Sequence, residues 1–90
     1  MKRADTVLDY VSEINEGALY PSDMKEAVIG VVERFGLDPL VLLDKMKCIR
    51  ILAKQGMNWE EAEEYFQFNT IGAWMGHGTP CFATLAKDLP

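Results

Sequence analysis

The stretch AVIGVVERFGLDPLVLLD, residues 27–44, decides between the two folds open to this chain. Its first half is a β-branched cluster around Gly30, and a glycine inside a helix costs about 1 kcal/mol relative to alanine. The central GLDP is turn-forming sequence, and the short apolar run LVLL follows it. We therefore predict a β-hairpin in which residues 27–35 pair with residues 39–43.

A helix is the alternative for the same region. Ser22 could cap it and Gly36 could end it. An apolar stripe at helical spacing would form its buried face: Met24, Ala27, Val28, Val31, Val32 and Phe35. Periodicity separates short apolar runs poorly, so the sequence leaves Val28–Phe35 open between strand and helix, and an all-α fold stays the alternative.

Helices are predicted on both sides of this region. Before it, apolar residues recur at helical spacing at Val7, Val11 and Ile14. After it, Asp44 can cap a helix over residues 45–55, which Gly56 would end. Asn58 and Glu61 form a capping box for the last helix, whose apolar face would hold Ala62, Tyr65, Phe66, Asn69, Gly72 and Ala73.

These elements give an α+β domain of order α-β-β-α-α, with the β-hairpin packed against a helical hairpin, in one domain over residues 1–90. Residues 77–90, HGTPCFATLAKDLP, are expected to be an irregular, partly apolar tail. A two-stranded hairpin is marginal alone and leaves bare strand edges, so we predict a homodimer in which hairpins pair across a two-fold axis.

Composition limits the function classes. The net charge of −5 disfavours sequence-independent attraction to phosphate backbones, so nucleic acid is an unlikely partner. No apolar run approaches the ~20 residues that span a bilayer, and MKRADTVLDY lacks the apolar segment of a signal peptide. We therefore expect a cytoplasmic protein without membrane contact, in which Cys48 and Cys81 are free thiols whose reactivity the sequence leaves open.

Charge is segregated between the last two predicted helices. The first carries Lys45, Lys47, Arg50 and Lys54, and the second carries Glu60, Glu61, Glu63 and Glu64. We interpret them as solvated faces with some cross-helix pairing. A helix–turn–helix would point the acidic helix at DNA, which is repulsive, so a nucleic-acid-associated regulator using the basic helix is the alternative function.

The stretch FNTIGAWMGHGTPCF, residues 68–82, concentrates glycines, aromatic residues, His77 and Cys81. Zinc needs three or four ligands, and a thiol nucleophile needs an oriented base; neither set is marked here. A small thiol or metal enzyme is therefore the third interpretation, and we expect no cofactor, metal site or catalytic residue.

Packing explains this stretch better. Gly72 and Gly76 are one turn apart and would let the chain lie close to another element. A buried Asn69 would hydrogen-bond to backbone. We expect residues 78–80 to turn the chain so that Phe82 folds back under Trp74.

AVIGVVERFG and LDKMKCIRILAKQGMNWEEAEEYFQFNTIGAWMGHGTPCF resemble a family of small bacteriophage, prophage and bacterial proteins. Its pattern combines an "AIIG" strand, a "K-C/I-I-E-I-L" helix, a "GM-x-x-E-E-A" turn and a closing "FN-x-x-G-A-W/Y-x-G-E-x-T-P" signature. The resemblance covers roughly residues 27–82 and implies a phage-type origin and a fold, but no activity. At the position of His77 the family pattern has an acidic residue, and at the position of Cys81 it has aliphatic residues. The matching signature positions are Asn69, Gly72, Ala73, Trp74, Gly76, Thr79 and Pro80.

The sequence thus predicts a phage-type accessory protein that acts as a non-enzymatic protein-binding module. Its partner would be a host or phage protein, bound through a surface near Trp74 and the acidic helix. Aromatic residues near this surface exceed the needs of a small core: Trp59, Tyr65, Phe68 and Trp74.

Overall fold

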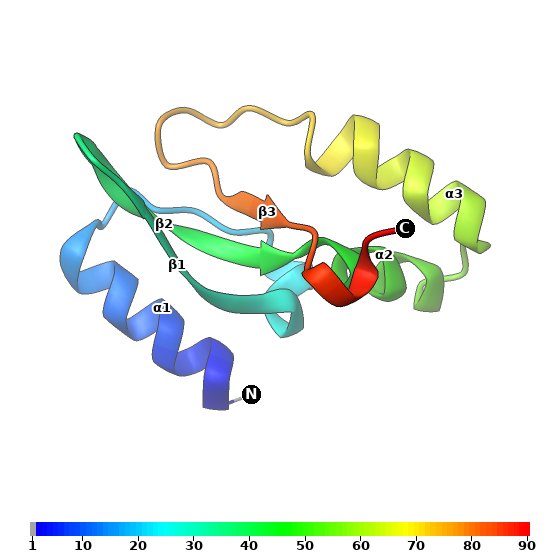
Figure 1. Ribbon diagram of the computed structural model, residues 1–90, viewed down its shortest axis with the longest axis horizontal. Helices are drawn as coiled ribbons and strands as arrows, with labels where there is room; N and C mark the ends of the chain where they lie inside the picture. The colour runs from blue at the N-terminus through cyan, green and yellow to red at the C-terminus, as the bar shows by residue number, and fades with distance from the viewer. Residues whose placement is uncertain (1) are drawn as a thin grey trace.

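The computed structural model describes residues 2–90 and has an α+β fold, as predicted: a three-stranded sheet with helices on one face and at one end (Figure 1). The elements run α1 (Lys2–Ile14), the 3₁₀ helix η1 (Ser22–Ala27), β1 (Val28–Arg34), β2 (Leu37–Asp44), α2 (Lys45–Lys54), α3 (Trp59–Tyr65), the π-helix η2 (Phe66–Thr70), β3 (Cys81–Ala83) and the 3₁₀ helix η3 (Ala86–Asp88).

The predicted hairpin is confirmed and the helical alternative for Val28–Phe35 is wrong. The turn is shorter than the predicted GLDP, because Leu37, Asp38 and Pro39 already belong to β2. Strands β1 and β2 pair antiparallel, with Val31 opposite Val41, and irregularities lie at both ends of the ladder. Gly36, in the tight turn between the strands, has a φ of 83°, a conformation that glycine adopts without strain. The β-branched residues before the turn pack better on a pleated sheet than on a helix.

The structure has a third strand, β3, that the predicted order α-β-β-α-α did not contain. β3 pairs parallel to β2, with Leu42 opposite Cys81 and Asp44 opposite Ala83, so β2 is the central strand. Parallel pairing requires a long connection, which here is the whole segment from α2 to Pro80. Three residues paired to a strand so distant in sequence leave no local signal, so this part of the tail was expected to be irregular.

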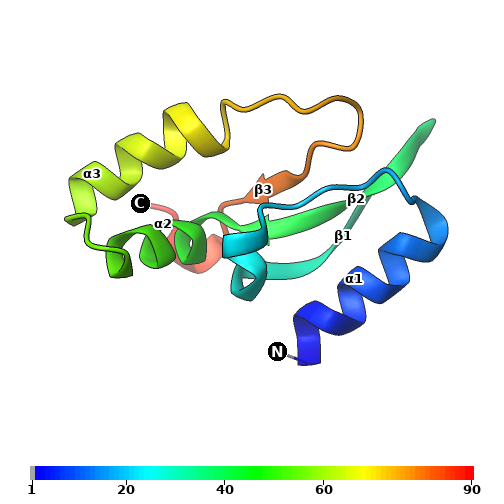
Figure 2. The same cartoon turned by 180° about the vertical axis from the view of Figure 1, so that it is seen from behind.

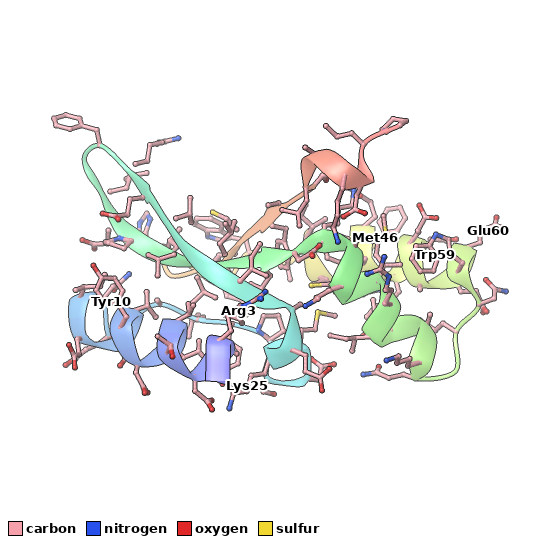
Figure 3. The ribbon with its side chains drawn as sticks, turned by 60° about the horizontal axis from the view of Figure 1, so that its bottom comes forward. Arg3, Tyr10, Lys25, Met46, Trp59 and Glu60 are labelled. Carbon is pink, nitrogen blue, oxygen red and sulfur yellow. The ribbon has the colours of Figure 1, made fainter. Side chains whose placement is uncertain are left out.

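One sheet face is buried and the other is half-buried. Val28, Val41 and Leu43 are buried in the core, while Leu40 and Leu42, which alternate with them, are half-buried. Helix α1 packs against β1 and β2 and contributes Val11 to this core. Figure 3 shows α1 beneath the hairpin, with α2 and α3 gathered at the opposite end of the molecule from the hairpin tip.

Two side-chain contacts attach α1 and the segment after it. Asn15 donates its Nδ2 hydrogen to the Pro39 carbonyl oxygen at 2.9 Å, which ties the end of α1 to β2. Lys25 on η1 forms an ion pair with Asp5 on α1 at 2.6 Å, and this pair lowers the pKa of Asp5 and raises the pKa of Lys25. The connecting segment runs back along the sheet to η1 (Figure 2).

The helix caps are as predicted. Asp44 accepts from the Met46 and Lys47 amides at 3.0 and 3.4 Å, at the point where β2 passes directly into α2. Asn58 and Glu61 form both bonds of the capping box, at 2.9 and 3.0 Å. These bonds satisfy amides that a helix start otherwise leaves without partners.

Candidate interaction surfaces

The π-helix η2 changes which residues after Phe66 face the core. The Ile71 amide bonds to the Phe66 carbonyl at 2.9 Å, and this i→i+5 bond adds a residue to the turn. Phe66 is buried, whereas Asn69 is exposed and its side-chain amide has no hydrogen-bond partner among residues 2–90. The prediction that Asn69 is a buried, bonded amide is therefore wrong: a regular helix was assumed through this position.

The close-packing role predicted for Gly72 and Gly76 belongs to Gly78. A Cβ on Gly76 would meet nothing within 4 Å, and this glycine is needed for its φ of 93°. A Cβ on Gly72 would press only on carbonyls of its own helical segment. A Cβ on Gly78 would clash with the Gly17 carbonyl oxygen, because the Leu19 amide donates to the Gly78 carbonyl at 2.9 Å.

Hydrogen bonds around Thr79 close a turn over residues 76–79, so the chain turns about two residues earlier than predicted at residues 78–80. The Thr79 hydroxyl donates to the Gly76 carbonyl and accepts from the Met75 amide, both at 2.7 Å. The Thr79 amide also donates to the Gly76 carbonyl at 3.1 Å, and Pro80 is buried. Thr79 and Pro80 of the signature thus shape the loop that leads into β3.

The expected contact between Phe82 and Trp74 is wrong. Phe82 packs edge-on against the buried Phe66 ring, with centroids 5.1 Å apart. Trp74 is 73 % exposed and meets the edge of the His77 ring at 6.1 Å. Strand β3 turns Phe82 toward the core face, since Phe82 pairs with the buried Leu43. Ala73, beside Trp74, is half-buried.

An apolar surface with acidic edges lies over α3 and η2. One hollow of about 380 Å³ is lined by Met57, Glu61, Glu64, Tyr65, Phe68 and Asn69. A second, of about 270 Å³, is lined by Leu19, Tyr20, Pro21, Asp23, Met24, Tyr65, Asn69, Thr70, Ala73 and Met75. Tyr65 and Asn69 line both, so the hollows adjoin. We call these lining residues the acidic–apolar surface; no lysine or arginine belongs to it.

A separate groove lies between the hairpin and the loop before β3. It has a volume of about 390 Å³ and is lined by Gly36, Leu37, Asp38, Leu40, Trp74, His77, Thr79, Pro80 and Cys81. We call it the hairpin groove. Trp74 therefore lies apart from the acidic helix, with which it was expected to form one surface. Figure 1 shows why: the loop after η2 runs back from α3 toward the hairpin before it enters β3.

The basic residues of α2 divide into two places. Lys47, Arg50 and Lys54 surround a small hollow of about 150 Å³ with Glu26 and Ile51. Lys45 instead lies over the Phe66 ring, with Nζ 5.8 Å from its centroid. Within residues 2–90 the carboxylates of α3 form no ion pair with these cations, so the expected cross-helix pairing is wrong.

The two thiols differ in environment. Cys48 is buried and free, and burial, with a smaller effect of the Asp44 and Asp23 carboxylates, raises the pKa of its thiol to about 12. Cys81 is half-buried in the hairpin groove, which His77 also lines. In the described part of the chain, no group of three or more histidine, cysteine, aspartate or glutamate side chains is placed to hold a metal ion.

No protein-family model, curated protein or solved structure matches this chain. Among the helices of residues 2–90, none has the length and apolar character required to cross a membrane.

Sequence reasoning missed Phe35 and Leu37 as surface residues. Phe35 is fully exposed at the hairpin turn, and Leu37 beside it is largely exposed. The predicted hairpin placed Phe35 in its first strand and Leu37 in its turn, whereas β1 ends at Arg34 and β2 begins at Leu37. The helical alternative placed Phe35 in a buried stripe.

Proposed function

We propose that this chain is a non-enzymatic, phage-type accessory protein of the cytoplasm that binds another protein through the acidic–apolar surface. One observation carries the proposal: two adjoining hollows over α3 and η2 expose apolar side chains. Phe68, which lines the first hollow, is 73 % exposed, and Tyr65 and Met75 are each more than 40 % exposed. Contiguous exposed apolar patches in small proteins mark interaction sites.

Charge defines the partner that this surface fits. Glu61 and Glu64 line one hollow and Asp23 lines the other, and no lysine or arginine lines either. Asp23 also borders a neighbouring hollow lined by Lys25 and Lys54, so Glu61 and Glu64 carry most of the acidic character. Glu60, at the start of the same helix, is also exposed and lies away from the hairpin (Figure 3). A protein segment that presents apolar anchors next to lysine or arginine would be complementary, and the acids would favour its approach at low salt.

Selection from a random peptide library on the immobilised protein tests this proposal. We expect enriched peptides to combine apolar residues at helical spacing with lysine or arginine. These peptides should fail to bind the Phe68→Asp variant of the protein. Phe35→Asp is the matched control, since it adds the same charge at an exposed aromatic position outside the surface. Enrichment of peptides that bind Phe68→Asp as well as the unmodified protein would contradict the proposal.

The basic side of α2 supports a second candidate, a nucleic-acid-associated regulator. Lys47, Arg50 and Lys54 converge on one hollow and form no ion pair among residues 2–90. Glu26 in the same hollow and the net charge of −5 oppose strong phosphate binding. A salt-sensitive shift of duplex DNA that disappears in Lys47→Glu/Arg50→Glu would favour this candidate over the first.

A further inference from the structure

The hairpin tip exposes an aromatic side chain that folding does not require. Gly36 alone supplies the positive φ of the turn, and Phe35 is fully exposed. The tip projects above the C-terminal end of α1 (Figure 1), and Phe35 is not part of this chain's own core. An exposed phenylalanine on a projecting element is suited to insertion into a pocket of another molecule.

A receptor for such a ring lies beside the tip. The hairpin groove is lined on one side by Leu37 and Leu40 of β2 and on the other by Trp74 and Pro80. Trp74 presents most of its ring there, held edge-on against His77. Aromatic rings prefer such offset or edge-to-face neighbours.

We propose that two copies of this chain associate about a two-fold axis, with Phe35 of each copy inserted into the hairpin groove of the other. The groove includes Gly36 and Leu37, which follow Phe35 directly in sequence. The inserting side chain, Phe35, and the groove that receives it therefore belong to one surface patch. A patch that contains both can pair with itself and close as a dimer, without forming a filament.

Charge on the same patch is complementary to itself. Arg34 precedes the turn and Asp38 lines the groove, and neither forms an ion pair within residues 2–90. The proposed dimer pairs Arg34 of one copy with Asp38 of the second. Such rim pairs fix orientation more than they add affinity.

The two aromatic rings supply more than half of the area that a small dimer interface needs. Aromatic side chains bury about 150–250 Å² each, so Phe35 and Trp74 together offer on the order of 350 Å² per copy. Two copies would bury about 700 Å² from these rings alone, and the rest of the patch must bring this to the roughly 1,200 Å² of a small specific interface. We expect dissociation constants in the range of about 1–100 µM.

Sedimentation analysis from about 1 µM to 1 mM measures this association directly. We expect Phe35→Asp to weaken it at least about thirty-fold, as for a central interface residue. Phe68→Asp, which adds the same charge at an exposed aromatic position outside the groove, should leave it unchanged. Circular dichroism before each run confirms that both variants are folded.

The charge pair provides a second readout. Arg34→Asp and Asp38→Arg should each weaken the dimer, and the double variant should restore it. A monomer throughout the concentration range would overturn the proposal. So would a dimer that Phe35→Asp leaves intact, or one that Phe35→Asp and Phe68→Asp weaken equally.

Discussion

Replacing Gly78 with alanine tests how the loop before β3 is held. The added Cβ would clash with the Gly17 carbonyl oxygen, lie 2.9 Å from the Gly17 carbonyl carbon and lie 3.5 Å from the Ala18 Cα. These are backbone atoms, which cannot rotate away as a side chain can. The loop must therefore move away from the segment after α1. Gly78 has no positive φ, so the effect is steric and not conformational.

The magnitude follows from two losses. Forced overpacking costs about 1–3 kcal/mol, and the bond from the Leu19 amide to the Gly78 carbonyl contributes about 1 kcal/mol. We expect the free energy of unfolding to fall by about 2–4 kcal/mol. A domain of this length is stable by roughly 5–13 kcal/mol, so the loss is a large share.

Urea unfolding followed by circular dichroism measures the change in the free energy of unfolding, from the midpoint of the transition and the slope of free energy against urea concentration. Gly30→Ala is the matched control: nothing lies within 4 Å of its added Cβ, and its φ is not positive. The free energy of unfolding of that variant should rise by roughly 0.4–1 kcal/mol, because alanine restricts the conformations of the unfolded chain. The reasoning is refuted if Gly78→Ala unfolds within 0.5 kcal/mol of the unmodified protein.

The remaining predictions concern α2. Asp44→Ala removes the cap between β2 and α2 and should lower the free energy of unfolding by about 0.5–2 kcal/mol in urea, with a smaller loss for Asp44→Ser, which can still cap. The pKa of Cys48 is raised from 9.0 to about 12, so its contribution to stability is complete below about pH 9 and falls as pH rises toward 12. Cys48→Ala should lose less stability across that pH range than the unmodified protein, and equal losses in both would contradict the burial argument.

The sequence predicted those elements whose signals are local. Caps depend on residues two or three positions apart, and Asp44 and Asn58 were both identified before the structure. The hairpin was favoured correctly because Gly30 and the turn sequence disfavour a helix. Local propensity and turn chemistry agreed there, and such agreement makes a prediction dependable.

The errors have a common cause in contacts between distant segments. The pairing of β3 with β2 and the approach of Gly78 to Gly17 join residues far apart in sequence. The π-turn at Phe66 has no simple sequence signal, and it moved Asn69 from a predicted buried position to the surface. The signature residues therefore shape a loop, while the exposed apolar residues beside them form the candidate surfaces.

The most direct test of the binding proposal is a ¹H–¹⁵N NMR titration of the protein with the tightest selected peptide. The account predicts progressive shifts of the Met57, Tyr65, Phe68 and Asn69 amides, which line the first hollow, and unchanged signals from Lys47 and Arg50 on α2. Shifts centred on Lys47 and Arg50, with Phe68 unaffected, would contradict it.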